Sequence, residues 1–77
     1  MQINQAIAQT IRELRTKNKV SQEKLAEVID SHQVYISEIE NGKKIPSITV
    51  LYKISLFFNL SLSEFTAYID KKMNIKA

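Results

Sequence analysis

The sequence lacks cysteine and tryptophan, and it contains a single glycine, a single proline and a single histidine. The absence of cysteine excludes disulfides, thiolate zinc sites, iron–sulfur clusters and cysteine catalysis. One histidine among scattered carboxylates offers no zinc ligand set, so we expect no metal, no other cofactor and no small-molecule ligand. The scarcity of glycine and proline favours helices joined by short turns.

Long apolar runs are also missing: none approaches the roughly 18 residues that a membrane span needs. The N-terminus lacks the basic region and apolar core of a signal peptide, so we expect a soluble cytoplasmic protein with no membrane partner. The 77 residues, 44% hydrophobic and 25% charged, suffice for one small globular domain. Small domains often gain stability from disulfides, a metal or a partner subunit. Oligomerisation is the option that remains here.

Charge alternates along the chain. The net charge is +3 over residues 1–20, −4 over residues 21–41, +3 over residues 42–60 and +1 over residues 61–77. One interpretation is an ordinary solvated surface. The other is a pair of basic clusters that hold an acidic middle segment close to nucleic acid.

Apolar spacing and capping residues predict five helices and no strand. Their expected spans are about residues 3–17, 21–29, 32–40, 48–58 and 62–70. Together they predict a compact all-α domain over residues 1–70, followed by a short polar tail at residues 71–77.

The helix ends carry recognisable stop and start residues. Ser21 and Ser47 are good N-caps, and Ser61 with Glu64 forms a capping box. Gly42 can adopt positive φ at the end of the third helix, and Asn59 is a plausible stop for the fourth. The apolar face of the first helix is expected to be formed by residues Ile3, Ile7, Ile11 and Leu14.

The second and third helices are short and joined by a tight turn, which is the shape of a helix-turn-helix unit. Ala26 is small where the two helices should cross. Leu25, Ile29, Ile36 and Ile39 are expected to face the core. The residues left outward on the third helix have side chains suited to base edges or to a thymine methyl: Gln33, Val34, Tyr35, Ser37 and Glu38.

The runs SQEKLA (21–26), YISEIENGK (35–43) and PS (46–47) resemble the Cro/phage-repressor-like helix-turn-helix family, also called the xenobiotic-response-element family. The resemblance extends over about residues 7–66 and implies a five-helix, lambda-repressor-like domain. It also implies a homodimer that binds double-stranded DNA through the third helix. Within the family, the small size and the Tyr-Ile-Ser run are similar to controller proteins of restriction–modification systems.

The resemblance also implies roles for individual residues. Five of them would contact DNA phosphates: Ser21, Gln22, Asn41, Lys43 and Lys44. Arg15 and Glu40 occupy the positions of a structural ion pair between the first and third helices. Two positions depart from the family, which often has glycine where this chain has Lys19 and Asp30. We expect the same backbone path there at a small cost in stability.

Several side chains have two interpretations. His32 is either a phosphate contact or pH switch, or an exposed turn residue. Tyr35 reads a base or packs on the helix surface. Glu38 accepts a hydrogen bond from a cytosine amino group, lies in solvent or repels wrong sequences. Lys43 and Lys44 bind phosphate or only solubilise a loop.

The aromatic and aliphatic residues near the C-terminus exceed what so small a core easily hides. We expect some of them to form a dimer face on the fifth helix and the loop before it, with Leu62, Phe65 and Tyr68 as candidates. The remaining ones would belong to the core.

The sequence therefore predicts a homodimeric, sequence-specific transcriptional regulator on a roughly palindromic operator, acting as an autoregulator or genetic switch. An antitoxin-like protein-interaction module that also binds DNA is the alternative. An enzyme is disfavoured, because no glycine-rich phosphate loop and no nucleophile–base set can be placed, and we expect no catalytic residue.

Overall fold

The computed structural model describes residues 1–73 and consists, over that range, of helices without strands. The helices are α1 (Ile3–Lys17), α2 (Gln22–Val28), α3 (Gln33–Glu40), α4 (Ile48–Phe57) and α5 (Leu62–Met73). The predicted all-α, five-helix architecture is confirmed. Its first four helices begin and end within a residue or so of the expected positions.

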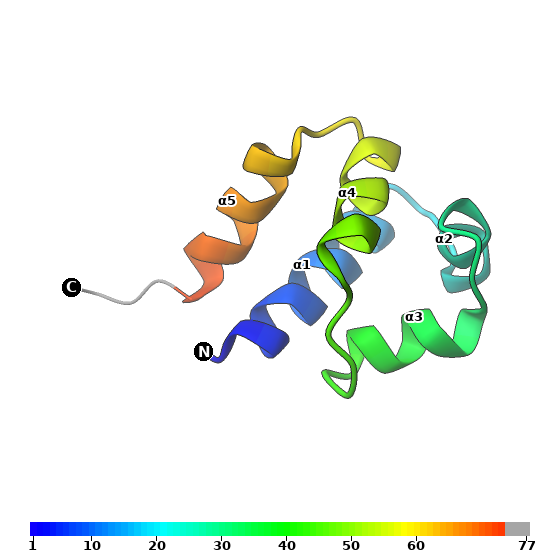
Figure 1. The fold of residues 1–77 in the computed structure, drawn as a ribbon, viewed down its shortest axis with the longest axis horizontal. Coiled ribbons are helices and arrows are strands. Elements are labelled where there is room, and N and C mark those ends of the chain that lie inside the picture. Colours follow the sequence, from blue (N-terminus) through cyan, green and yellow to red (C-terminus); the bar gives the residue numbers. More distant parts are fainter. Residues whose placement is uncertain (74–77) are drawn as a thin grey trace.

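Helix α1 runs through the middle of the molecule, between α5 on one side and the α2–α3 pair on the other (Figure 1). The fold measures 38 × 25 × 22 Å. Side chains from all five helices meet in one core, in which the most deeply buried large residues are Ile11, Leu25, Ile36, Ile39, Ile54 and Phe65. This arrangement leaves the outer face of α3 at one end of the molecule (Figure 1).

The expected apolar face of α1 is only partly buried. Ile7 and Ile11 lie in the core and Leu14 packs against it, as predicted. Ile3 belongs to this face but is not buried, since the residue is 53% exposed. It is the first residue of the helix, and with Ile48 and Met73 it lines an open apolar groove between α1, α4 and α5.

The first four helices end in the same way, with a residue in the left-handed region one place after the C-cap. These residues have φ values of 57° at Lys19, 61° at Asp30, 74° at Gly42 and 64° at Asn59. In each case this residue and the next donate their backbone N–H groups to carbonyls of the last turn, as in a Schellman motif. The backbone path expected at Lys19 and Asp30 is therefore present, although neither residue is glycine.

Hydroxyl groups cap three helix starts as predicted. Ser21 accepts a hydrogen bond from the Lys24 backbone N–H, and Ser47 accepts one from Val50. The Ser61 backbone N–H donates to the Glu64 carboxylate at 2.8 Å, and the Glu64 backbone N–H donates to the Ser61 hydroxyl at 3.0 Å. This pair is the expected capping box.

The predicted tail is wrong for residues 71–73, which continue α5. Lys72 places its Nζ 2.7 Å from Glu13 Oε1 on α1, and Met73 packs against the core. Lys72 thereby contacts a residue of α1 that is distant in the sequence, which sequence polarity does not reveal. The rest of the predicted tail, residues 74–77, lies outside the described residues.

Candidate nucleic-acid interface

Helices α2 and α3 pack closely on each other and present α3 outward. Ala26, 2% exposed, allows the close approach, and Leu25, Ile36 and Ile39 are fully buried. The turn between the helices is closed by a hydrogen bond of 2.8 Å from the Ser31 backbone N–H to the Ala26 carbonyl. Burying the apolar side of α3 in this way leaves its polar side toward solvent.

The five residues predicted to read bases differ in accessibility. Gln33 is exposed and Val34 is 63% exposed, so both are free to meet a partner. Ser37 and Glu38 are half-buried. Tyr35 is also half-buried and packs against the core, so packing explains part of its presence. The most accessible residues of this set therefore lie in the first turn of α3.

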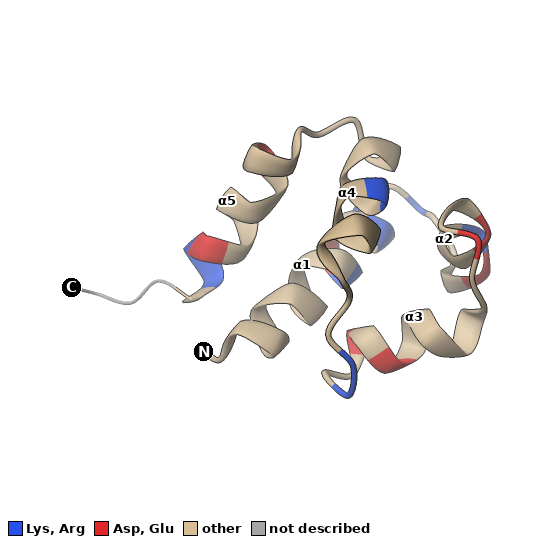
Figure 2. Cartoon of the chain, in the orientation of Figure 1, with Lys and Arg blue, Asp and Glu red and all other residues tan. Residues whose placement is uncertain are grey.

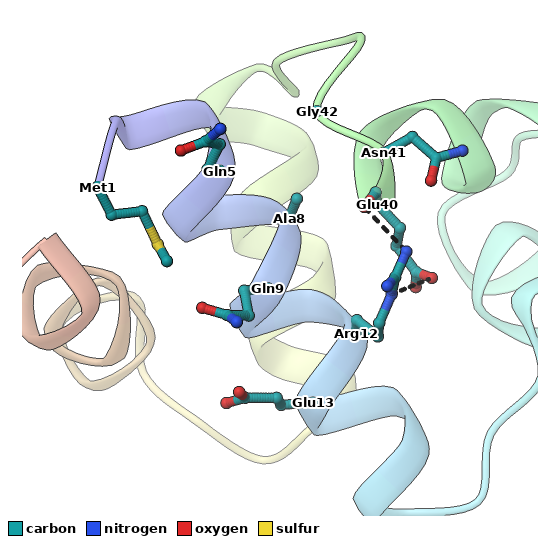
Figure 3. Close-up of a pocket in the computed structure, with 9 residues that line it drawn as sticks. All are labelled: Met1, Gln5, Ala8, Gln9, Arg12, Glu13, Glu40, Asn41 and Gly42. Carbon is teal, nitrogen blue, oxygen red and sulfur yellow. Dashed lines mark hydrogen bonds and ion pairs between the residues drawn. The ribbon is translucent and has the colours of Figure 1, made fainter.

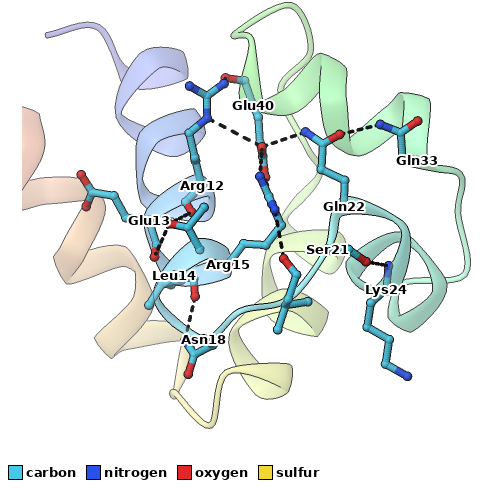
Figure 4. Close-up of polar contacts among 12 residues, drawn as sticks. Arg12, Glu13, Leu14, Arg15, Asn18, Ser21, Gln22, Lys24, Gln33 and Glu40 are labelled. Atoms are coloured by element: carbon cyan, nitrogen blue, oxygen red, sulfur yellow. Dashed lines mark hydrogen bonds and ion pairs between the residues drawn. The ribbon is translucent and has the colours of Figure 1, made fainter.

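Glu40 connects three helices from the end of α3 (Figure 4). Its carboxylate is 1% exposed and accepts two hydrogen bonds from Arg15 of α1, at 2.6 and 3.0 Å. Gln22 of α2 donates a third at 2.9 Å. The ion pair between Arg15 and Glu40 that the family resemblance implied is thus present. The hydrogen bond to Glu40 raises the pKa of the Arg15 guanidinium above its ordinary value, and the carboxylate's charge adds to this against the opposing effect of burial.

Gln22 is hydrogen-bonded to residues at both ends of α3. Its amide nitrogen donates to Glu40, and its amide oxygen accepts a hydrogen bond from the side chain of Gln33 (Figure 4). Gln22 was predicted only as a phosphate contact. In the structure it also lies between Glu40 and Gln33, the first residue of α3, and is hydrogen-bonded to both.

The other predicted phosphate contacts lie around the two ends of the helix pair. The Ser21 hydroxyl is engaged as a cap but the residue is exposed. Asn41, Lys43 and Lys44 are exposed at the end of α3 and in the loop that follows. Lys44 approaches Glu38 at 3.8 Å, so their charges partly offset each other.

Sequence reasoning missed Arg12. Its Nη2 donates a hydrogen bond of 3.1 Å to the Glu40 backbone carbonyl, and its Nε lies 3.7 Å from the Glu40 carboxylate. A signal existed, because Arg12 precedes Arg15 by three residues and so shares its side of α1.

Charged residues are sorted by segment along the fold (Figure 2). Acidic residues mark α2 and the end of α3, while basic residues mark α1 and the loop after α3. The alternation seen along the sequence thus becomes an acidic helix pair with basic flanks on both sides.

The residues of α5 predicted to form a dimer interface differ in their exposure to solvent. Phe65 was wrong as an interface residue, because it is completely buried in the core and has no surface to offer a second chain. Leu62 is half-buried against the core, and Tyr68 is 41% exposed. Helical spacing alone did not reveal which of the aromatic residues of α5 lies on the side that faces the core.

An exposed apolar row on α4 was also missed. Ile48, Tyr52 and Leu56 recur every four residues and are 60%, 48% and 53% exposed. Lys53 is the one charged residue of α4. We call Ile48, Tyr52 and Leu56 the α4 row.

Residues 1–73 contain no group of three or more histidine, aspartate or glutamate side chains placed to hold a metal ion. Over the same residues, no helix is long and apolar enough to cross a membrane.

Two short packed helices with an outward α3, fixed to α1 by Glu40, define a helix-turn-helix domain. The chain belongs to the helix-turn-helix family, which it matches over residues 11–65. The resemblance inferred from the sequence is confirmed.

Individual relatives agree with this. The chain is 41% identical over 58 residues to the control protein C.MunI of a Mycoplasma species, covering 75% of this chain and 78% of the relative. It is 31% identical to the control protein C.SmaI of Serratia marcescens, covering 80% and 74%. The fold is similar to that of the clp gene regulator ClgR of Corynebacterium glutamicum, with a TM-score of 0.87, 23% identity and coverage of 95% and 78%. Both relatives identified by sequence are control proteins.

Proposed function

We propose that this protein is a sequence-specific DNA-binding transcriptional regulator whose α3 enters the major groove. The observation that carries the proposal is the hydrogen-bonded chain from Arg15 through Glu40 and Gln22 to Gln33. It ties an exposed amide at the start of α3 to the rigid core. A glutamine can form two hydrogen bonds with adenine in the major groove, and this contact discriminates bases when the side chain is held in place.

Affinity and specificity then come from different residues. Exposed polar and basic groups beside α3, such as Asn41, Lys43 and Lys44, contact phosphates and set the position of the domain. Gln33 and Val34 are the most exposed residues of the predicted base-reading set. Glu38 and the acidic residues of α2 weaken attraction to arbitrary DNA, so binding depends more on the base contacts.

The proposed active form is a homodimer. The domain is at most 38 Å long and its α3 has only eight residues, so one copy reaches few base pairs. Two copies related by a two-fold axis would read two half-sites roughly 34 Å apart on a palindromic operator.

Two exposed apolar surfaces can carry this dimer. One lies on α5 around Tyr68 and Leu62, as the sequence suggested, and the other is the α4 row. Tyr68→Arg and Leu56→Arg test them separately, since each adds one charge to one surface. Sedimentation equilibrium is expected to show monomers for the variant whose surface forms the interface and dimers for the other variant.

A control role in a genetic switch follows from the same features. The chain is similar to two control proteins over three quarters or more of its length. We therefore propose an autoregulator of the controller-protein type. Its activity would depend on its concentration through dimerisation. An antitoxin-like module is the alternative, and it would bind a protein partner through the same surfaces.

Selection of bound duplexes from a random pool tests the proposal, with Gln33→Ala run in parallel. A two-fold-related consensus that relaxes at one symmetric position in Gln33→Ala is the expected result. Gln2→Ala is the matched control, since Gln2 has an exposed side chain outside the helix pair that makes no capping hydrogen bond. Salt-sensitive binding without any enriched sequence would contradict the proposal, because phosphate contacts alone behave in that way.

A further inference from the structure

An open hollow of about 490 Å³, lined by both polar and apolar residues, lies between α1 and the end of α3 (Figure 3). Gln5, Gln9 and Arg12 line it from α1, where their spacing of four and three residues puts them on one face. Asn41 and Gly42 close the other side.

Two hydrogen bonds join α1 to the end of α3 and to the loop after it. Asn4 Nδ2 donates a hydrogen bond of 3.2 Å to the Gly42 carbonyl, which ties the loop to the first turn of α1. Arg12 Nη2 bonds the Glu40 carbonyl at 3.1 Å, which ties α1 to the end of α3. A group that entered the hollow would therefore meet side chains already in position.

Arg12, Glu13 and Glu40 line the hollow, and counting them together with Arg15 and Lys72, which lie next to it, leaves one cation over. Glu40 is neutralised by Arg15 at 2.6 Å, and Glu13 is neutralised by Lys72 at 2.7 Å. Arg12 lies farther from the Glu40 carboxylate, at 3.7 Å, and its side chain is 53% exposed. A guanidinium carries five N–H donors, so Arg12 keeps donors for a further acceptor.

We infer that this hollow seats one phosphate group of the DNA backbone beside the half-site that α3 reads. The inference rests on the proposed function and adds a residue, Arg12, that the family motif did not supply. The half-exposed Arg12 guanidinium is bonded to Glu40 but keeps further N–H donors. It therefore suits a phosphate, which accepts several hydrogen bonds from such donors. The place also fits, because the hollow adjoins the end of α3 next to Lys43, where a flanking backbone must pass.

The first test compares Arg12→Gln with Lys53→Gln, which removes the same charge from α4. Affinity is measured for a selected duplex and for a scrambled duplex over a range of salt concentrations. Arg12→Gln is expected to weaken binding roughly tenfold per protomer on both duplexes. It should also lower the salt slope by about 0.9 per protomer. Lys53→Gln should change neither value, and Arg12→Lys should restore the slope.

The second test locates the phosphate. Neutral methylphosphonates are placed one at a time along the duplex, and one position near each half-site should weaken the wild-type protein but leave Arg12→Gln unaffected. If no position behaves in this way, or if Arg12→Gln binds with wild-type affinity and slope, the inference is overturned while sequence-specific binding stands. A loss confined to the selected duplex would also overturn it, since that result means that Arg12 only positions α3. A wild-type protein that binds neither duplex would overturn the proposed function as well.

Discussion

Replacing Glu40 of α3 with glutamine removes the negative charge to which Arg15 of α1 and Gln22 of α2 are hydrogen-bonded. The side chain keeps its size, but Arg15 loses its ionic partner while only 16% of its side chain is exposed. Breaking a buried ion pair from one side costs about 3–5 kcal/mol. Because Arg15 retains some solvent and its bond to the Val20 carbonyl at 3.0 Å, we expect Glu40→Gln to lower the free energy of unfolding by about 2–4 kcal/mol.

That loss is large for so small a domain. A domain of this length has a total stability of roughly 4–11 kcal/mol, and each kcal/mol shifts the melting temperature by about 4–8 °C. Thermal and urea unfolding followed by circular dichroism measure the change directly. Glu27→Gln is the matched control, because the Glu27 carboxylate is exposed and contacts only Lys24 at 3.3 Å. It should cost less than about 0.5 kcal/mol.

A double variant separates charge from packing. Replacing both partners, as in Arg15→Met with Glu40→Leu, removes the unpaired charge and should recover at least half of the lost stability. The reasoning is refuted if Glu40→Gln stays within 1 kcal/mol of the wild type, or if the double variant is no more stable than Glu40→Gln.

Three further predictions concern backbone strain, the core and DNA binding. Lys19→Gly should raise the free energy of unfolding by about 0.5 kcal/mol. The reason is that relief of strain in the left-handed conformation outweighs the extra conformational entropy that glycine gives the unfolded chain. A lower melting temperature would contradict this prediction. In urea unfolding, Phe65→Ala should lower the free energy of unfolding by about 3–5 kcal/mol. Tyr68→Ala should lower it by less than about 1 kcal/mol. Similar losses for the two variants would contradict the difference in burial between Phe65 and Tyr68. Gln22→Ala should weaken binding to the selected duplex more than binding to a scrambled one, because Gln33 loses its support; equal losses would mean that Gln22 contacts phosphate alone.

The helix positions could be predicted from the sequence because their signals are local. Ser21, Ser47 and the Ser61–Glu64 box satisfy backbone groups within one turn, so their effect does not depend on the rest of the fold. Asn59 and Gly42 stop helices for the same reason. The family motif supplied the ion pair of Arg15 with Glu40, which no local rule contains.

Features that depend on tertiary packing could not be predicted in this way. Phe65 and Tyr68 are three residues apart on α5, yet one is buried against the core and the other is largely exposed. Lys72 extends α5 through a partner on α1 that is 59 positions away in the sequence. The hydrogen bonds of Gln22 and the hollow beside Arg12 likewise arise only when helices distant in the sequence pack together.

Recognition of a particular DNA sequence by α3 is tested most directly by a specificity ratio. Affinities are measured for the duplex obtained by selection and for a scrambled duplex of equal length and composition, at about 0.15 M salt. A ratio of about a thousand or more is expected for a specific regulator, falling sharply in Gln33→Ala. A ratio near one for the wild-type protein would contradict the account, even if both duplexes bound tightly.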